Sequence, residues 1–475
     1  MGKKLLYGLI MCFSIGTTIA QHEHPTSAQY IWPTDPLVSQ KLDAWRDLKF
    51  GMIIHWGLYA EAGIIESWSI CSEEWISRDS TADYAKYKEW YWGLSKQFNP
   101  QQFNPEQWAQ AASDAGMGYV VFTTKHHDGF AMFDTKQTDF KITNGPFASH
   151  PKSNVALHVF EAFRKQKMMI GAYFSKPDWH SEYYWWPKYA TPDRNNNYDI
   201  RKYKWRWNKY KTFTHEQIRE LMTDYGAMDI LWLDGGWVRP KETVNAEVLS
   251  WGAPIPEWSQ DIDMKQVAEM ARAKQPGLLI VDRTVHGPFE NYLTPEQNIP
   301  KSKLDYPWES CITLGGAWGY VPNDNFKSSA TVIRLLSEIV AKGGSLLLGV
   351  GPGRDGTLNE VQISRLKEIG AWLKVNGDAI YNTRTADVYT DGPNFFTKGK
   401  NGEIYAIVPL NEGESMPSSV TWRGNVPARG SDVKLLLNGK KVKWVRSGDS
   451  ITITLPAEVR KLKSYPALAF SFNAR

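Results

Sequence analysis

The chain has 475 residues, a hydrophobic content of 42%, a charged content of 22% and a formal net charge of +4. These values are ordinary for a soluble globular protein with one large domain and a smaller one, and the charge is too balanced to favour nucleic acid or an anionic membrane as a partner. The 22 Trp and 22 Tyr are unusually many. Their flat faces suit a protein core, and they also suit the C–H faces of sugars.

The first 20 residues have the pattern of a secretory signal peptide. Lys3 and Lys4 precede an apolar run over 5–15, and a small-residue cleavage site ends at Ala20. The apolar run is too short to span a membrane. We therefore expect cleavage near Ala20, a secreted or periplasmic protein without membrane insertion, and a formal charge of +2 once the two lysines are lost.

Apolar runs that end in turn signals or polar groups recur along the chain and indicate buried strands. They cover residues 50–56, 119–129, 168–175, 230–234, 277–283 and 345–350. Segments with helical periodicity or helix start and stop signals alternate with them, at 105–116, 155–167, 214–226, 263–274, 328–341 and 360–375. Two long aromatic insertions, 59–99 and 181–211, are expected to shape the rim of a pocket.

This alternation predicts an α/β fold with a parallel sheet, for which two topologies compete. An open doubly wound sheet would carry a glycine-rich turn after the first strand, and the sequence has none there. A closed barrel carries its chemistry at the carboxyl ends of several strands, where the sequence places His55, His126, His127, Asp234 and Arg283. We therefore predict a (β/α)8-like TIM barrel over residues 21–383. Because only about six of the eight strands stand out in the sequence, the prediction allows for a barrel that is imperfect.

The pattern changes after Asn376-Gly377. Residues 404–408, 433–437 and 451–455 form short apolar runs, and Asn438-Gly439 is a hairpin-type turn. We predict a small C-terminal antiparallel β-sandwich over residues 384–475.

The stretch 230–237 is the centre of the predicted site. Four apolar residues lead to Asp234, two glycines follow it, and Trp232 and Trp237 flank the carboxylate. A lone Asp-Gly more often closes a turn. A carboxylate, two glycines and two tryptophans at one strand end favour a ligand site instead, because glycine lets a ligand approach the backbone closely.

Glycoside hydrolases use two carboxyl groups for catalysis, and such a pair in an aromatic pocket indicates this reaction. We choose Glu309, in Trp308-Glu309-Ser310, as the partner of Asp234. The alternatives that the sequence leaves open are Glu66, Glu74, Glu290 and Glu296. His126 and His127 suit hydrogen bonding to neighbouring sugar hydroxyls.

A metal site and a purely structural role are the rival interpretations of these histidines. Adjacent residues of an extended strand point to opposite faces, so His126 and His127 would not converge on one ion. The sequence has no HExxH motif, and Cys71 and Cys311 lack metal-ligand spacing, although one disulfide between them stays open. We therefore expect no metal and no cofactor.

Four motifs together resemble glycoside hydrolase family 29, the retaining α-L-fucosidases. They lie at residues 50–57, 123–130, 231–237 and 346–352, and Thr123-Thr-Lys-His-His-Asp-Gly-Phe130 is the most specific of them. The resemblance extends from Trp45 to about Tyr381. It implies an imperfect (β/α)8 barrel followed by a β-sandwich, and exo-acting release of terminal α-linked L-fucose through a covalent fucosyl-enzyme.

The resemblance also implies roles for individual residues. Asp234 is the nucleophile, and Glu309 matches the acid/base position of one branch, in which a Trp-Glu pair precedes a segment like Trp318-Gly-Tyr320. The residues implied to bind the sugar are His55, Glu74, Trp75, His126, His127, Trp232, Arg283 and Trp318. The expected substrate is a fucosylated oligosaccharide or glycoconjugate. The alternatives are a fucose-binding lectin without turnover and, with less support, a metal-dependent hydrolase that uses His126 and His127.

Overall fold

The computed structural model describes residues 30–73, 83–191 and 193–474. The predicted signal peptide, Glu74 and Trp75 lie outside these residues. Among the helices of the described part, none is long and apolar enough to cross a membrane.

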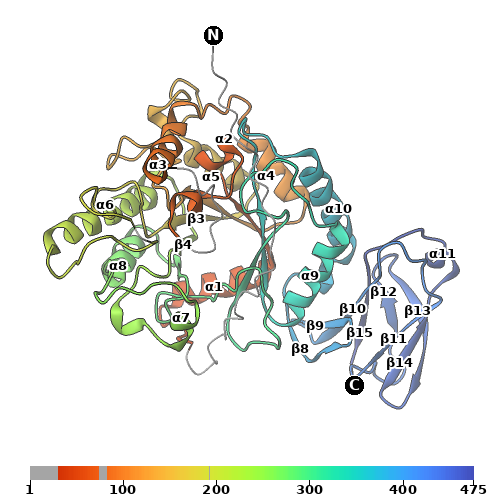
Figure 1. The fold of residues 1–475 in the computed structure, drawn as a ribbon. Helices are drawn as coiled ribbons and strands as arrows, with labels where there is room; N and C mark the ends of the chain where they lie inside the picture. Colours follow the sequence, from red (N-terminus) through yellow and green to blue (C-terminus); the bar gives the residue numbers. More distant parts are fainter. Residues whose placement is uncertain (1–29, 74–82, 192, 475) are drawn as a thin grey trace, which may run out of the picture.

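A sheet of seven parallel strands forms the centre of the larger part of the molecule (Figure 1). The strands are β1 (Phe50–Ile54), β2 (Tyr119–Lys125), β3 (Met169–Ser175), β4 (Ile230–Asp234), β5 (Leu279–Asp282), β6 (Glu309–Thr313) and β7 (Ser345–Val350). Their order in space is β5-β4-β3-β2-β1-β7-β6. Nearly every residue of these strands is buried, which explains why the sequence shows apolar runs rather than alternation.

Residues 290–297 take the place of a strand between β5 and β6. Asn291 N–H donates to Ile280 O at 2.9 Å on one side, and Glu309 N–H donates to Leu293 O at 2.8 Å on the other. Pro295 has no N–H to donate, which explains why this segment is no regular strand. The predicted (β/α)8-like barrel with imperfect closure is confirmed.

Helices surround the sheet in Figure 1, as the predicted crossovers require. The longer ones are α1 (Pro36–Leu48), α3 (Tyr84–Gly93), α4 (Pro105–Asp114), α5 (Val155–Lys165), α6 (Lys204–Asp224), α8 (Met264–Lys274), α9 (Ser329–Ala341) and α10 (Glu360–Asn376). The expected helix start at Thr214 is wrong. Helix α6 begins ten residues earlier, and Trp207 and Tyr210 are buried on its first turns. In the first turns of α6, polar and basic residues alternate with the aromatic ones, so the apolar residues do not show a clear helical periodicity in the sequence.

The C-terminal part is an eight-stranded antiparallel sheet around a second core. The strands are β8 (Thr383–Asp391), β9 (Asn394–Gly399), β10 (Glu403–Pro409), β11 (Ser419–Arg423), β12 (Val433–Leu435), β13 (Lys440–Ser447), β14 (Ser450–Thr454) and β15 (Ala467–Asn473). The strand order is β11-β14-β13-β12-β15-β10-β9-β8. Trp422 and Phe470 fill the second core. The predicted antiparallel β-sandwich is therefore confirmed.

Candidate active site

Asp234 is the last residue of β4 and lies at the carboxyl end of the barrel. The Tyr173 hydroxyl donates to its Oδ2 at 2.7 Å, and Arg283 Nη1 donates to its Oδ1 at 2.8 Å. His127 Nε2 lies 3.6 Å from Oδ2. Each of these three groups comes from a different strand end, so the carboxylate is held in one orientation by the barrel itself.

Asp234 carries a stable negative charge. Burial opposes this charge, but the Arg283 guanidinium and the hydroxyl of Tyr173 together hold the pKa of the carboxyl well below its ordinary value. The group is therefore ionised over the whole working range of an enzyme. An ionised, partly accessible carboxylate at a strand end is equipped to act as a nucleophile.

The two glycines after Asp234 are required by close packing. Gly235 has a φ of +88°, and a Cβ on it would lie 2.2 Å from Pro177 Cδ. A Cβ on Gly236 would lie 2.0 Å from the Thr284 hydroxyl oxygen. Only glycine allows the turn that leaves the carboxylate at the strand end.

Three histidines line the same end of the barrel. His55 follows β1, and His126 and His127 follow β2, with 4.3 Å between the ring centroids of the adjacent pair. The expectation that these two rings point to opposite faces is wrong, because β2 ends at Lys125 and the pair lies beyond the pleated strand. Ser67 Oγ is hydrogen bonded to His126 Nδ1, and Ser175 Oγ to His127 Nδ1 at 2.8 Å.

Burial keeps these imidazoles neutral. It lowers the pKa of His126 to about 4 and the pKa values of His55 and His127 well below the ordinary value. His55 Nδ1 is buried and has no hydrogen-bond partner among the described residues. A neutral imidazole offers one donor and one acceptor, which is what a sugar hydroxyl needs.

Glu309 does not lie beside Asp234. It is the first residue of β6, fully buried, where it accepts hydrogen bonds from the Tyr119 hydroxyl at 2.6 Å and from Trp232 Nε1 at 3.2 Å. Tyr119 and Ser345, its neighbours, also begin their strands. This placement does not support the choice of Glu309 as the partner of Asp234, since Glu309 lies toward the amino end of the barrel interior.

Glu296 is the carboxyl group that the structure brings to Asp234. The Arg283 guanidinium donates from Nη1 to Asp234 Oδ1 at 2.8 Å and from Nη2 to Glu296 Oε2 at 2.9 Å. Trp318 Nε1 donates to the other oxygen of Glu296 at 3.2 Å. The side chain of Glu296 is 47% exposed, so it stands at the mouth of the site.

The other two candidates for the second carboxyl group that lie in the described residues are Glu290 and Glu66, and both are hydrogen bonded to other parts of the protein. Glu290 is buried and accepts from Thr284 N–H at 2.8 Å and from His286 Nδ1 at 2.6 Å. Glu66 is buried and accepts from the backbone N–H groups of Trp318 and Gly319 at 2.8 and 2.9 Å. Both carboxyl groups fix loops around the site rather than facing its opening.

Aromatic rings form the walls of the site. Trp68, Trp179 and Trp237 each have a ring centroid 5.1 Å from that of His127. Trp318 lies 5.0 Å from His55, and Trp232 stacks on Tyr173 at 5.3 Å with the Arg283 guanidinium over it. Among the described residues, these contacts bring together His55, His126, His127, Trp232, Asp234, Arg283 and Trp318.

Tyr173 and Arg194 were not predicted as site residues. Tyr173 lies inside an apolar run that reads as core, and only the pairing of β3 with β4 places its hydroxyl at Asp234. The guanidinium of Arg194 lies over the rings of Trp68 and Trp237, at 5.0 and 5.1 Å from their centroids. Its place in an aromatic insertion was the only signal in the sequence.

His126, His127 and Asp234 also have the spacing of a candidate metal site. Each offers one ligand atom, and these atoms lie within 4.8 Å of one another. The Arg283 cation already contacts Asp234 at 2.8 Å. A second cation on the same carboxylate would be repelled, so the donor set fits a sugar better than a metal ion.

Comparisons with known proteins agree on one family. Residues 17–378 match the family described as Alpha-L-fucosidase. The plasma alpha-L-fucosidase of Pongo abelii is 26% identical over 456 residues, which cover 90% of each chain. The Alpha-L-fucosidase of Branchiostoma floridae is also 26% identical, over 89% of this chain and 90% of its own.

Solved structures share the fold. Alpha-L-fucosidase isoenzyme 1 from Paenibacillus thiaminolyticus superposes with a TM-score of 0.72 at 28% identity, over 92% of this chain and all of its own. A family 29 alpha-L-fucosidase from Bacteroides thetaiotaomicron, trapped as a covalent intermediate, has a TM-score of 0.70 at 22% identity. It covers 95% of this chain and all of its own, and at that identity it supports the architecture alone.

Proposed function

The chain belongs to the α-L-fucosidase family, glycoside hydrolase family 29, and is an exo-acting α-L-fucosidase; from this premise we propose that Asp234 and Glu296 work as a retaining pair. The observation that carries the proposal is the single guanidinium of Arg283, which is hydrogen bonded to both carboxyl groups. Retaining glycosidases need their carboxyl groups about 5 to 5.5 Å apart. Bridging by one guanidinium supports a separation of this order.

In the first step, Asp234 attacks the anomeric carbon of fucose, and the bond from that carbon to the glycosidic oxygen breaks. Glu296 gives its proton to that oxygen, so that the rest of the glycan leaves as a neutral alcohol. The product is a covalent ester between fucose and Asp234. In the second step, Glu296 takes a proton from water as the water attacks the anomeric carbon, and Asp234 leaves as a carboxylate.

The buried histidines hold the sugar during both steps. His126 and His127 use one ring nitrogen each on Ser67 and Ser175, which leaves the other nitrogen for a fucose hydroxyl. The family resemblance adds Glu74 and Trp75 to this set. The substrate is a fucosylated oligosaccharide or glycoconjugate. The pattern of residues 1–20 supports a secreted or periplasmic protein with cleavage near Ala20, which N-terminal sequencing of the mature protein would test.

The anomeric form of the first product tests the mechanism. Hydrolysis of an aryl α-L-fucoside, followed by NMR, should give α-L-fucose before mutarotation. β-L-Fucose as the first product would overturn retention. A lectin would bind fucose and release none, so detectable turnover also removes that alternative.

Exhaustive chelation tests the metal alternative at His126, His127 and Asp234. The proposed roles need no ion, so activity should persist after dialysis against a strong chelator. Loss of activity that zinc restores would transfer the proposal to metal-dependent hydrolysis.

A further inference from the structure

Ser175 is the last residue of β3 and lies beside Asp234, its partner in the pairing of β3 with β4. It is fully buried, and it follows Tyr173 by two residues, so both side chains leave the same face of the strand. Its hydroxyl oxygen lies 2.8 Å from His127 Nδ1 and 3.3 Å from the Tyr173 hydroxyl oxygen. A serine hydroxyl has a single hydrogen, so it can donate to only one of these two neighbours.

The direction of the Tyr173 hydrogen bond is decided by Asp234. The carboxyl group of Asp234 is ionised, because its pKa lies well below the ordinary value, and an ionised carboxylate only accepts hydrogen bonds. Tyr173 keeps its proton, since burial raises the pKa of the phenol well above its ordinary value. The Tyr173 hydroxyl therefore donates to Asp234 Oδ2 at 2.7 Å, and toward Ser175 it can only accept.

Two arrangements of the remaining protons satisfy this constraint. In the first, the neutral imidazole of His127 carries its proton on Nδ1 and donates to Ser175, which in turn donates to Tyr173. The lone pair of His127 Nε2 then faces Asp234 Oδ2, which lies 3.6 Å away. In the second, Ser175 donates to His127 Nδ1, and the proton of the imidazole lies on Nε2, beside the carboxylate.

Electrostatics and geometry both favour the second arrangement. A lone pair beside a largely buried carboxylate is repelled, whereas an N–H dipole in the same place is attracted, and the low local dielectric strengthens both effects. The first arrangement gains only a hydrogen bond between Ser175 and Tyr173. At 3.3 Å this contact is longer than an ordinary bond between hydroxyls, while the contact of 2.8 Å between Ser175 and His127 is present in both arrangements.

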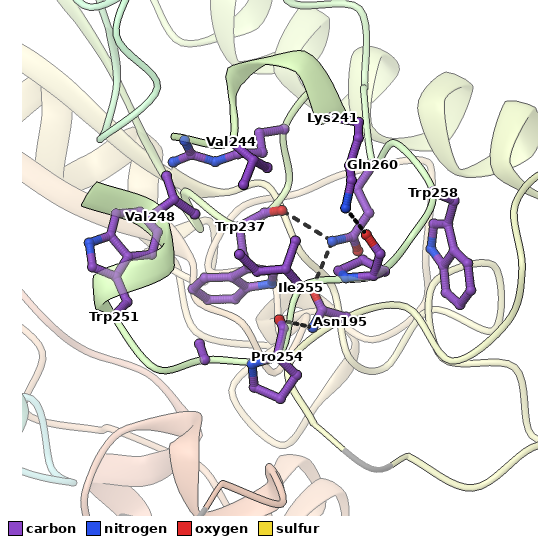
Figure 2. Close-up of a pocket in the computed structure, with 13 residues that line it drawn as sticks. Asn195, Trp237, Lys241, Val244, Val248, Trp251, Pro254, Ile255, Trp258 and Gln260 are labelled. Atoms are coloured by element: carbon purple, nitrogen blue, oxygen red, sulfur yellow. Dashed lines mark hydrogen bonds between the residues drawn. The ribbon is translucent and has the colours of Figure 1, made fainter. Parts of the chain in front are cut away.

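Aromatic rings hold the imidazole of His127 in place. The rings of Trp68, Trp179 and Trp237 lie around it, each at a centroid distance of 5.1 Å. Trp237 is itself fixed from its other side, where Gln260 Nε2 donates to its backbone oxygen at 3.1 Å (Figure 2). The imidazole ring therefore keeps its orientation, and the position of its proton is the property that a neighbouring side chain can set.

We infer that Ser175 is a positioning residue, whose hydroxyl donates to His127 Nδ1 and so holds the proton of this imidazole on Nε2, next to the nucleophile. The inference rests on the proposed roles of Asp234 and His127. The Nε2–H dipole favours the ionised form of Asp234. It also makes His127 a donor to the sugar, so the fucose hydroxyl that meets this nitrogen accepts the hydrogen bond.

The position of the proton can be measured without changing Ser175. In wild-type enzyme labelled with ¹⁵N at histidine, long-range ¹H–¹⁵N spectra distinguish a ring nitrogen that carries the proton from one that accepts a hydrogen bond. His127→Gln identifies the signals of His127 by their loss. We expect the proton on Nε2. A proton on Nδ1 would overturn the inference, whatever the activity of the enzyme.

Ser175→Ala removes the donor and leaves the aromatic rings around His127 unchanged. We expect the Nδ1 signal of His127 to move toward that of a nitrogen without a donor. We also expect kcat/KM to fall by about tenfold or more, for an aryl α-L-fucoside and for α-L-fucosyl fluoride alike, because His127 acts on fucose rather than on the leaving group. Ser175→Thr keeps the hydroxyl and should restore the signal and most of the rate, even where its additional methyl group lowers the unfolding temperature.

Ser337→Ala is the matched control. Ser337 is also fully buried, and its hydroxyl donates to Ile333 O within α9 at 2.7 Å. The control should lose stability as Ser175→Ala does, with the His127 signals and both rates unchanged. If Ser175→Ala gives this same result, Ser175 is only a buried structural residue and the inference fails. Failure of the wild-type enzyme to release fucose from either substrate would instead reject the proposed function, and the position of the proton would still decide the inference.

Discussion

Asp234 combines two opposing effects at one residue. Burial favours its neutral form, and the contact with Arg283 at 2.8 Å favours the carboxylate, which prevails. We predict that Asp234→Gly lowers turnover of an aryl fucoside by several orders of magnitude, because the covalent route is lost. Arg283 keeps Glu296 as a partner, so the variant should unfold near the wild-type temperature.

Azide makes this test specific. It should enter the space left by the Asp234 side chain, attack from that face, and give β-fucosyl azide with partial recovery of turnover. Near-normal turnover of Asp234→Gly without azide would refute the assignment.

In the proposed mechanism, Glu296 acts on the other face of the anomeric carbon. We predict that Glu296→Ala impairs natural fucosides, whose poor leaving groups need a proton, by about a hundredfold or more. Aryl fucosides with good leaving groups should still form the covalent intermediate, visible as a burst of released phenol. Azide should then attack the intermediate and give α-fucosyl azide. Equal impairment of both substrate classes would exclude Glu296 as the acid/base.

Glu309 is a second buried carboxyl group of the barrel, and a variant of it serves as the control for Glu296→Ala. Its ionisation also makes the stability of the fold depend on pH. Burial raises the pKa of its carboxyl to about 7, although Tyr119 and Trp232 donate to it. Between its unfolded pKa and about 7, the unfolded chain has lost this proton and the folded chain retains it, so stability falls as the pH rises through this window. The loss is at most about 3 kcal/mol.

We predict that Glu309→Gln removes this penalty. The variant should gain thermal stability relative to the wild type at pH 8 and gain less at pH 5, because the amide stays neutral at both. Thermal unfolding at the two pH values provides the measurement. Fucosidase activity at neutral pH should change little, and loss of activity like that of Glu296→Ala would return the acid/base role to Glu309.

At the scale of elements, the regular parts of the barrel were predictable and its irregular side was not. Strands β1 to β5 and β7 are recognisable in the sequence as apolar runs. Strand β6 has the sequence Glu-Ser-Cys-Ile-Thr. Its polar residues are buried and hydrogen bonded, so a search for apolar runs misses the strand. Because strand β6 was not predicted, the sequence could not place Glu309 at the start of a strand. Glu296 was therefore only one of several candidates for the second carboxyl group of the site.

The two aromatic insertions are joined by a clamp between Glu73 and Arg194. Arg194 Nε donates to Glu73 Oε1 at 2.8 Å and Nη2 donates to Oε2 at 3.2 Å. The same guanidinium lies between the rings of Trp68 and Trp237. The clamp therefore couples the segment before Glu74 to the aromatic wall of the site.

We predict that Arg194→Met raises KM for aryl fucosides by about tenfold or more and lowers the unfolding temperature, because Glu73 loses its buried partner. Arg194→Lys should rescue little, since an ammonium cannot make the two-point contact or stack between the rings. A double variant with Glu73→Leu should lose less stability than the two single losses combined. Additive losses would show that the two side chains act independently.

At the scale of the molecule, the C-terminal sheet is packed against the outer helices of the barrel. Phe395, Ile407 and Ala469 belong to the same buried cluster as the barrel helices, and Trp372 Nε1 of α10 donates to Ala467 O at 2.8 Å. Asp47, near the first strand, pairs with Arg384 at 2.6 Å and with Lys400 at 2.5 Å. The alternating pattern of the sequence predicted the sheet, but pairing between residues more than three hundred positions apart leaves no local signal.

Strand β9 offers two neighbouring residues that test this packing. Phe395 faces the barrel helices and the adjacent Phe396 faces the core of the sheet, as alternation along a strand requires. Replacing either buried ring by alanine should cost about 3 to 5 kcal/mol. If the two parts unfold as one cooperative unit, both variants should lower the temperature of a single calorimetric transition, and fucosidase activity should be lost at that same lowered temperature. If the sheet unfolds independently, Phe396→Ala should instead produce a separate early transition with activity retained beyond it. The shared cluster and the ion pairs at Asp47 favour the first result.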